Sequence, residues 1–190
     1  MKSFRGFSVG AVVIVAVIAG LLVFATSVIL NKSETSIDRY SVYLEASEEN
    51  GGIADHVKGK KDAPVLIFEY ADYQCPGCAS INSYVNKAVE ESDGKLAVIY
   101  RSMLLSYHQN ATAAASAAEA AGLQNYWKEY ADKLFNRQSE WEEAEPSDRT
   151  ELFVKYFKEV TDGKGDVEQF EDDMVSANVS KKISFDMNSA

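Results

Sequence analysis

The two cysteines of this 190-residue sequence lie three positions apart, as Cys75 and Cys78 in the stretch EYADYQCPGCAS. Only Pro76 and Gly77 separate them. A Cys-x-x-Cys pair can carry out thiol–disulfide exchange, supply half of the ligands of a zinc site, or form a short structural disulfide. The rest of the chain must supply the features that distinguish these three kinds of chemistry.

Thiol–disulfide exchange needs a thiolate, because the thiolate and not the thiol attacks a disulfide. A pair at the start of a helix places its first sulfur near free backbone N–H groups and the positive end of the helix dipole, which stabilise a thiolate. We therefore interpret Cys75 as the exposed nucleophile and Cys78, one helical turn later, as the resolving thiol. Pro76 suits the first helical position, where no N–H donor is needed.

The two other kinds of chemistry find less support. Zinc needs four ligands, and the remaining soft donors, His56 and His108, lie 19 residues before and 30 residues after the pair. Neither spacing is that of a zinc finger or ribbon, so the sequence favours no metal and no other cofactor. A structural disulfide would close a loop of four residues, which removes little chain entropy and adds little stability.

The residues around the pair predict a strand, a helix and a second strand. VLIFEY (65–70) is a short apolar run typical of a buried strand, and KLAVIY (95–100) predicts another. Between them, residues 78–92 predict a helix with one apolar face. This face consists of Ile81, Tyr84, Val85, Ala88 and Val89. Residues 65–101 should form a βαβ unit with parallel strands, and the cysteines lie where the first strand meets the helix.

The chain after this unit has a helical pattern throughout. An alanine-rich stretch (110–123), two stretches with aromatic residues at helical spacing (125–138 and 148–160) and a last amphipathic stretch extend to the C-terminus. The aromatic residues are most simply explained as a packed core rather than as a cofactor site. The sequence thus predicts an α/β fold in which residues 108–187 form a helical insert.

The N-terminus predicts a membrane anchor. The 22 residues from Val9 to Leu30 carry no charge, and at about 1.5 Å per residue they would span roughly 33 Å, close to a bilayer core. We expect residues 1–31 to form an uncleaved signal anchor; a signal peptide cleaved near VFATS is the alternative. Lys2 and Arg5 precede this stretch, so the positive-inside rule predicts a single-pass cell-membrane protein with an extracytoplasmic catalytic domain.

The rest of the chain divides into a linker and a domain. Residues 32–61 are polar and irregular, with room for one short strand or helix at residues 40–46, and predict a linker. Residues 62–190 should form the domain that carries the cysteines. The net charge of −10 disfavours nucleic acid as a partner.

DAPVLIFEYADYQCPGC (62–78) resembles the first strand and active site of the DsbA-like thiol–disulfide oxidoreductases, in their membrane-anchored bacterial branch. The resemblance continues through residues 98–122 and 126–135 and covers roughly residues 57–187. It implies a thioredoxin fold with an inserted helical domain, acting on reduced secreted proteins. It also implies re-oxidation by a quinone-linked membrane partner of the DsbB or VKOR kind.

Several residues match the positions of this family's site. Cys75 and Cys78 match the nucleophile and the resolving cysteine. Glu69 lies six residues before Cys75, where the family often has a buried acid that passes protons to the inner thiol; a desolvated carboxyl can do this near neutral pH. The alternative is a Glu69 on an exposed strand face. We interpret Asp72 as fixing the loop, and His108 as a helix-entry or packing residue, with a general-base role as the alternative.

The C-terminal part departs from the family. A thioredoxin fold needs a cis-proline loop, two antiparallel strands and a closing helix after the helical insert. The prolines of this chain are Pro64, Pro76 and Pro146, and none precedes a C-terminal strand. We therefore expect the C-terminal strands to be missing, as in a sequence truncated before the cis-proline loop or a degenerate gene product. A catalytically impaired, membrane-tethered binding module is the alternative to an active enzyme.

Overall fold

The computed structural model describes residues 43–190. Residues 43–190 form one compact unit. The predicted signal anchor and the first part of the predicted linker lie outside the described residues. Within residues 43–190, no helix combines the length and the apolar character needed to cross a bilayer.

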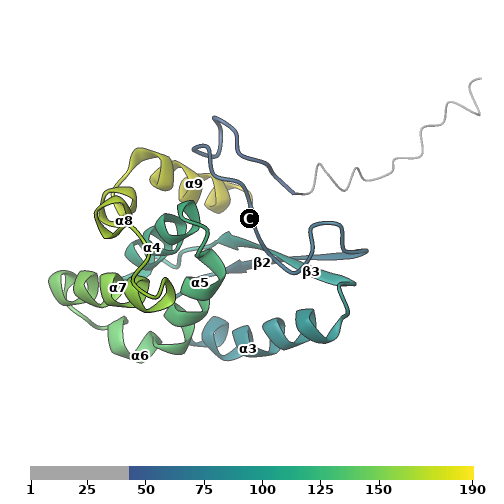
Figure 1. The fold of residues 1–190 in the computed structure, drawn as a ribbon, viewed down its shortest axis with the longest axis horizontal. Coiled ribbons are helices and arrows are strands. Elements are labelled where there is room, and N and C mark those ends of the chain that lie inside the picture. The colour runs from purple at the N-terminus through teal and green to yellow at the C-terminus, as the bar shows by residue number, and fades with distance from the viewer. Residues whose placement is uncertain (1–42) are drawn as a thin grey trace, which may run out of the picture. The chain divides into compact units, whose positions relative to one another are not determined.

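The described residues form a small sheet followed by a block of helices (Figure 1). In chain order the elements are β1 (His56–Lys58), β2 (Val65–Ala71), α3 (Pro76–Glu91), β3 (Leu96–Ser102), α4 (Ala111–Leu123), α5 (Trp127–Asn136), α6 (Gln138–Trp141), α7 (Pro146–Val160), α8 (Val167–Met174) and α9 (Ala177–Asn188). The strand–helix–strand order predicted around the cysteines is confirmed. No strand follows β3 within the described part, in agreement with the expected lack of C-terminal strands.

The sheet has the order β1-β3-β2. β2 and β3 run parallel, as predicted, with Val65 opposite Leu96 and Ala71 opposite Ser102. β3 is central and its residues from Ala97 onward are buried. The prediction that β2 is a buried strand was wrong for the described residues, because β2 has a neighbour on one side only and Val65 is 52% exposed.

The short strand β1 lies within residues 32–61, for which the sequence predicted a linker. It pairs antiparallel with β3, with Val57 opposite Ile99. A strand of three residues is too short to give a hydrophobic pattern, so the sequence did not indicate it. Gly59 ends β1 with a φ of +98°, and a Cβ there would lie 2.7 Å from the carbonyl oxygen of Leu96. The chain can pass this close to β3 only with glycine.

Helix α3 buries only part of the predicted face, because Val85 and Val89 are half-buried but Ile81, Tyr84 and Ala88 are exposed. Ile81 and Tyr84 are 53% and 72% exposed, whereas Asn82 is buried. The amide of Asn82 accepts a hydrogen bond from Lys58 Nζ and donates one to Asp132. Because these partners satisfy its polar atoms, the inner face of α3 includes a polar residue that a hydrophobicity pattern assigns to solvent.

The aromatic residues of the helical block form its core, as predicted. Trp127, Tyr130 and Phe135 of α5 are buried, as are Phe153 and Phe157 of α7. The Phe157 ring stacks on Phe170 of α8 with 4.2 Å between centroids. The alanines of α4 allow close helix approach, and α4 packs against α5, α8 and α9.

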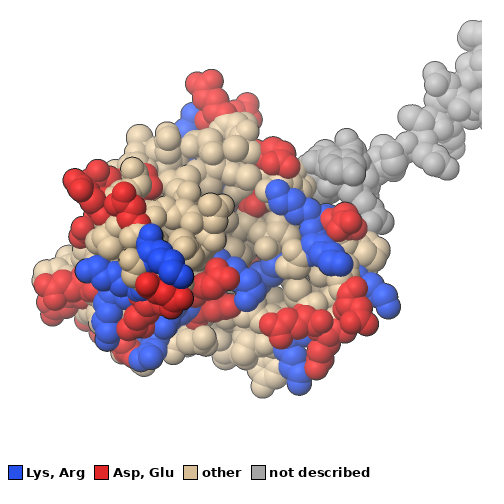
Figure 2. All heavy atoms as spheres, in the orientation of Figure 1, with Lys and Arg blue, Asp and Glu red and all other residues tan. Residues whose placement is uncertain are grey.

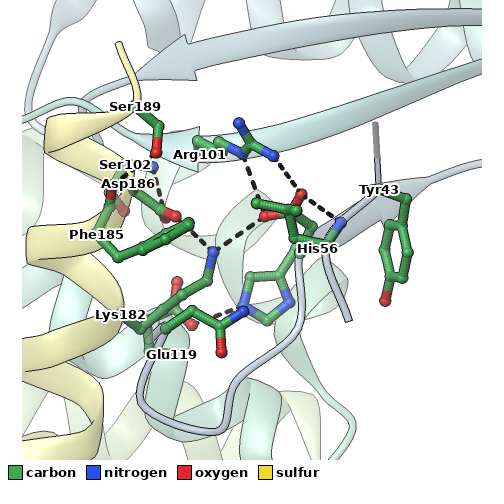
Figure 3. A network of polar contacts seen from close by, with 12 residues as sticks. Tyr43, His56, Arg101, Ser102, Glu119, Lys182, Phe185, Asp186 and Ser189 are labelled. Atoms are coloured by element: carbon green, nitrogen blue, oxygen red, sulfur yellow. Dashed lines mark hydrogen bonds and ion pairs between the residues drawn. The ribbon is translucent and has the colours of Figure 1, made fainter. Parts of the chain in front are cut away.

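A buried network of charges joins α9 to the sheet (Figure 3). Lys182 is fully buried, with its Nζ 3.2 Å from Asp55 and 2.5 Å from Asp186. Asp55, just before β1, also pairs with Arg101 of β3 at 2.7 Å. Asp186 accepts the backbone N–H of Ser102. This network links α9, the segment before β1 and the central strand, and it lies on the sheet face opposite α3 (Figure 1).

Charges of both signs are distributed over the surface. On the face drawn in Figure 2, acidic side chains intermix with lysines and arginines, and no extended basic surface is visible on that face.

Candidate active site

The cysteine pair lies at the start of α3, where the sequence analysis placed it. Cys75 is the N-cap residue, and Pro76 is among the first helical residues. Both cysteines are half-buried free thiols. No side chain caps the helix, so the first backbone N–H groups of α3 remain open to a charge at Cys75.

Burial raises the pKa of the Cys78 thiol to about 11. A hydrogen bond from the Asp72 backbone acts in the opposite direction, while the hydrogen bond to Cys75 and the negative charges of Cys75 and Asp72 add to the rise. Cys78 is therefore a protonated thiol at neutral pH when the pair is reduced. The role of Cys78 as the resolving thiol stays a prediction.

Asp72 organises the turn before the cysteines. Its side chain is buried, and its backbone carbonyl accepts the N–H of Cys75 at 3.0 Å. Its carboxylate accepts the N–H groups of Gln74 and Leu105, at 2.8 and 2.9 Å. The same carboxylate lies 2.8 Å from His108 Nδ1. The loop-fixing role expected for Asp72 thus has geometric support, and His108 is its side-chain partner.

Gln74 fastens the turn to the helical block. Its Oε1 accepts the N–H of Asn110, and its Nε2 donates to the carbonyl of Glu142. Asn110 donates its own side-chain amide to the same carbonyl. A cavity of about 400 Å³ lies beside this turn, lined by Gln74, Pro76, Tyr107, His108, Gln109, Glu142 and Glu143.

Glu69 lies on the face of β2 that meets α3, and 12% of its side chain is exposed. Its Oε2 is 3.3 Å from the ammonium group of Lys58, which is 1% exposed. The other oxygen, Oε1, is buried and has no hydrogen-bond partner among the described residues. Glu69 is therefore not on an exposed strand face, but Asp72 is the carboxylate whose charge acts on Cys78.

The sequence reasoning missed Lys58, Gln74 and Asn110. Lys58 comes from a strand without a sequence pattern, and the two amides have no spacing that relates them to the cysteines. His56, the other candidate ligand, stacks on Trp127 and pairs with Glu119 at 2.8 Å. In residues 43–190 no group of three or more His, Cys, Asp or Glu side chains is arranged to hold a metal ion.

A parallel βαβ unit with a dithiol at the helix N-terminus defines a thioredoxin-like α/β protein. The family model described as Thioredoxin matches residues 52–190. The chain belongs to this family.

Solved structures share the fold. BdbD from Bacillus subtilis, in its oxidised form, superposes with a TM-score of 0.60 at 21% identity, covering 77% of each chain. The alpha-DsbA1 of Wolbachia pipientis gives 0.58 at 24% identity, covering 72% of this chain and 67% of that one. The predicted thioredoxin-like α/β fold is thereby confirmed.

Two curated relatives differ in how much of their length is matched. The Na(+)/H(+) antiporter NhaA 1 of Mycolicibacterium gilvum is 30% identical over 139 residues, which are 72% of this chain and 21% of the antiporter. The chain thus spans about a fifth of that relative. The probable disulfide bond formation protein D of Bacillus cereus is 27% identical over 196 residues, covering 100% of this chain and 84% of that protein.

Proposed function

We propose that the protein is an extracytoplasmic thiol–disulfide oxidoreductase that forms or exchanges disulfides in secreted proteins. The observation that carries this proposal is the pair of half-buried free thiols at the N-terminus of α3, with Cys75 as the N-cap and Cys78 one turn later. The family membership and the similarity to a probable disulfide bond formation protein support it.

The oxidising reaction has two exchange steps. A substrate thiolate attacks the Cys75 sulfur of the Cys75–Cys78 disulfide, which breaks the S–S bond and forms a mixed disulfide. Cys78 leaves as a thiolate and takes up a proton, because its pKa is about 11. A second substrate thiolate attacks the substrate sulfur of the mixed disulfide and releases Cys75 as a thiolate. The substrate loses two electrons, and the cysteine pair gains them.

Glu69 belongs to this proposal as a proton carrier for Cys78. Its buried Oε1 has no hydrogen-bond partner among the described residues, so it retains an acceptor for a proton. The ammonium group of Lys58 at 3.3 Å compensates the charge of the carboxylate when the proton leaves.

The location and the partners complete the proposal. Residues 1–31 would anchor the protein in the cell membrane, and residues 32–61 would link this anchor to the catalytic domain. Residues 62–190 would act on reduced secreted proteins outside the cytoplasm. A quinone-linked membrane oxidase of the DsbB or VKOR kind would restore the disulfide. The oxidising conditions outside the cytoplasm suit such a cycle.

Mixed-disulfide trapping tests the proposal. The oxidised protein should form disulfides in a reduced model protein, and a Cys75→Ser variant should not. A Cys78→Ser variant should accumulate a covalent adduct between Cys75 and a disulfide-bearing substrate, because the resolving thiol is gone. A purified chain that forms neither disulfides nor adducts would contradict the enzyme and favour a tethered binding module.

A further inference from the structure

The buried carboxylate of Asp72 lies between the redox pair and a histidine. Asp72 is 1% exposed and its carboxylate holds Gln74, Leu105 and His108 by hydrogen bonds of 2.8 to 2.9 Å. Its backbone contacts both cysteines, through the N–H of Cys75 and the thiol of Cys78. The carboxylate charge therefore acts on the Cys78 thiol, and the backbone of the same residue holds the N–H of Cys75.

The charge of Asp72 affects only one redox state of the pair. The disulfide is neutral, whereas the reduced pair carries negative charge whenever a thiolate forms. A buried carboxylate nearby therefore disfavours the thiolate and, with it, the reduced state. A group that partly neutralises the negative charge of this carboxylate shifts the redox equilibrium of the cysteine pair back towards the reduced state. The disulfide is then a stronger oxidant.

His108 is placed to give this compensation. Its Nδ1 lies 2.8 Å from Asp72 Oδ2, and 13% of its side chain is exposed. The imidazole contacts Asp72 and lies edge-to-face with the Tyr107 ring, with 4.5 Å between the ring centroids; Glu142 and Glu143 line the same cavity as His108. An N–H donated at Nδ1 draws charge from the carboxylate whether the ring is neutral or protonated.

We propose that His108 is a positioning residue of the redox site which, through the carboxylate of Asp72, sets the reduction potential of the Cys75–Cys78 pair. This inference rests on the proposed exchange function and adds to it a control on the direction of exchange. The contact joins residues 36 positions apart, so sequence spacing gives no sign of it.

Two substitutions should act in opposite directions. His108→Leu leaves the Asp72 carboxylate uncompensated, so the equilibrium with glutathione should shift towards the disulfide form by roughly three- to tenfold at slightly alkaline pH. Asp72→Asn removes the charge and keeps an acceptor oxygen for one of the two N–H groups, since Gln74 donates to Oδ1 and Leu105 to Oδ2. It should shift the equilibrium towards the reduced form by a similar factor. His108→Gln can still donate to Asp72 and should lie nearer the wild type.

The pKa of Cys78 is the second readout. In a Cys75→Ala background, the pH dependence of alkylation should show a higher pKa for Cys78 with His108→Leu and a lower one with Asp72→Asn. Gln109→Leu changes a neighbouring residue that lines the same cavity without contacting Asp72, and it should leave both readouts unchanged. Circular dichroism identifies any variant that does not fold.

The outcomes separate this inference from the proposed function. Shifts of both variants in the same direction, as loosening of the turn would produce, or no shift in either, would overturn the role of His108. A wild-type chain that forms no disulfides in proteins would instead refute the oxidoreductase. The glutathione equilibrium and the Cys78 titration can still be measured on such a chain.

Discussion

At the residue scale, the site consists of two kinds of groups. Cys75 and Cys78 can be recognised from their spacing in the sequence. The strand before them and the helix after them were predicted from hydrophobicity patterns. The groups that control the chemistry of the cysteines have no recognisable spacing relative to them, because the fold brings these groups together from distant parts of the sequence. Asp72 and His108 meet across 36 positions, and Lys58 comes from a three-residue strand.

The high pKa of Cys78 makes the stability of the reduced protein depend on pH. Folding raises this pKa from 9.0 to about 11, so the folded state holds the proton more tightly than the unfolded state does. The stabilising effect of this proton is complete below pH 9.0 and is lost as the pH rises towards about 11. Relative to a Cys78→Ser variant, the reduced wild type should lose stability across this range.

Urea unfolding of both proteins under reducing conditions, at a series of pH values, measures this difference. The comparison with Cys78→Ser removes the contributions of tyrosines and lysines that titrate in the same range. A difference that stays constant between neutral pH and pH 11 would contradict the pKa of about 11 given to Cys78.

The pair of Lys58 and Glu69 should be needed for folding as well as for proton transfer. Lys58→Met removes the cation that pairs with the buried Glu69 carboxylate. Removing one partner of a buried ion pair typically lowers the free energy of unfolding by about 3 kcal/mol or more. The double variant Lys58→Met/Glu69→Gln should recover part of this loss. Chemical denaturation of the wild type, Lys58→Met, Glu69→Gln and the double variant gives the coupling energy. Lys60→Met, at an exposed lysine, is the control; equal effects at both lysines would count against the pair.

At the element scale, the sequence predicted which segments become helices better than which faces they bury. The spacing of the aromatic residues in α5 and α7 identified core positions correctly, because large apolar side chains gain the most free energy when they are buried away from water. In α3 the same reasoning was wrong for Ile81 and Tyr84, which are exposed, while Asn82 is buried with hydrogen bonds to Lys58 and Asp132. Polar burial depends on partners that are distant in sequence, so periodicity cannot indicate it.

The position of α9 should depend on Lys182. Its ammonium group lies within 3.2 Å of Asp55 and is closer still to Asp186, and it is fully buried. Lys182→Met leaves Asp186 without its cation, so we expect a loss of roughly 3 kcal/mol or more in the free energy of unfolding. Lys181→Met changes the exposed neighbour and should cost less than about 0.5 kcal/mol. Amide hydrogen exchange in α9 should increase only in Lys182→Met, and equal exchange in both variants would contradict this role of the network.

At the scale of the whole molecule, β2 forms an edge of the sheet in the part of the chain that the structure describes. Val65 donates its N–H to Lys95, and Ala71 accepts the N–H of Met103, so the alternate residues Leu66, Phe68 and Tyr70 direct their backbone groups away from β3. Val65, Ile67 and Phe68 are 52%, 48% and 40% exposed. The sequence pattern of β2, apolar on both faces, is typical of a parallel strand whose two faces are covered by other elements.

An apolar strand with unpaired backbone groups is a site for association between chains. We expect the purified protein to self-associate as its concentration rises, and Ile67→Lys to reduce this association because a charge on the edge opposes pairing with another strand. Val175→Lys adds the same charge at an exposed apolar residue between α8 and α9 and serves as the matched control. Sedimentation velocity of the three proteins at several concentrations measures the effect. If Val175→Lys reduced association as much as Ile67→Lys, net charge rather than the β2 edge would govern it.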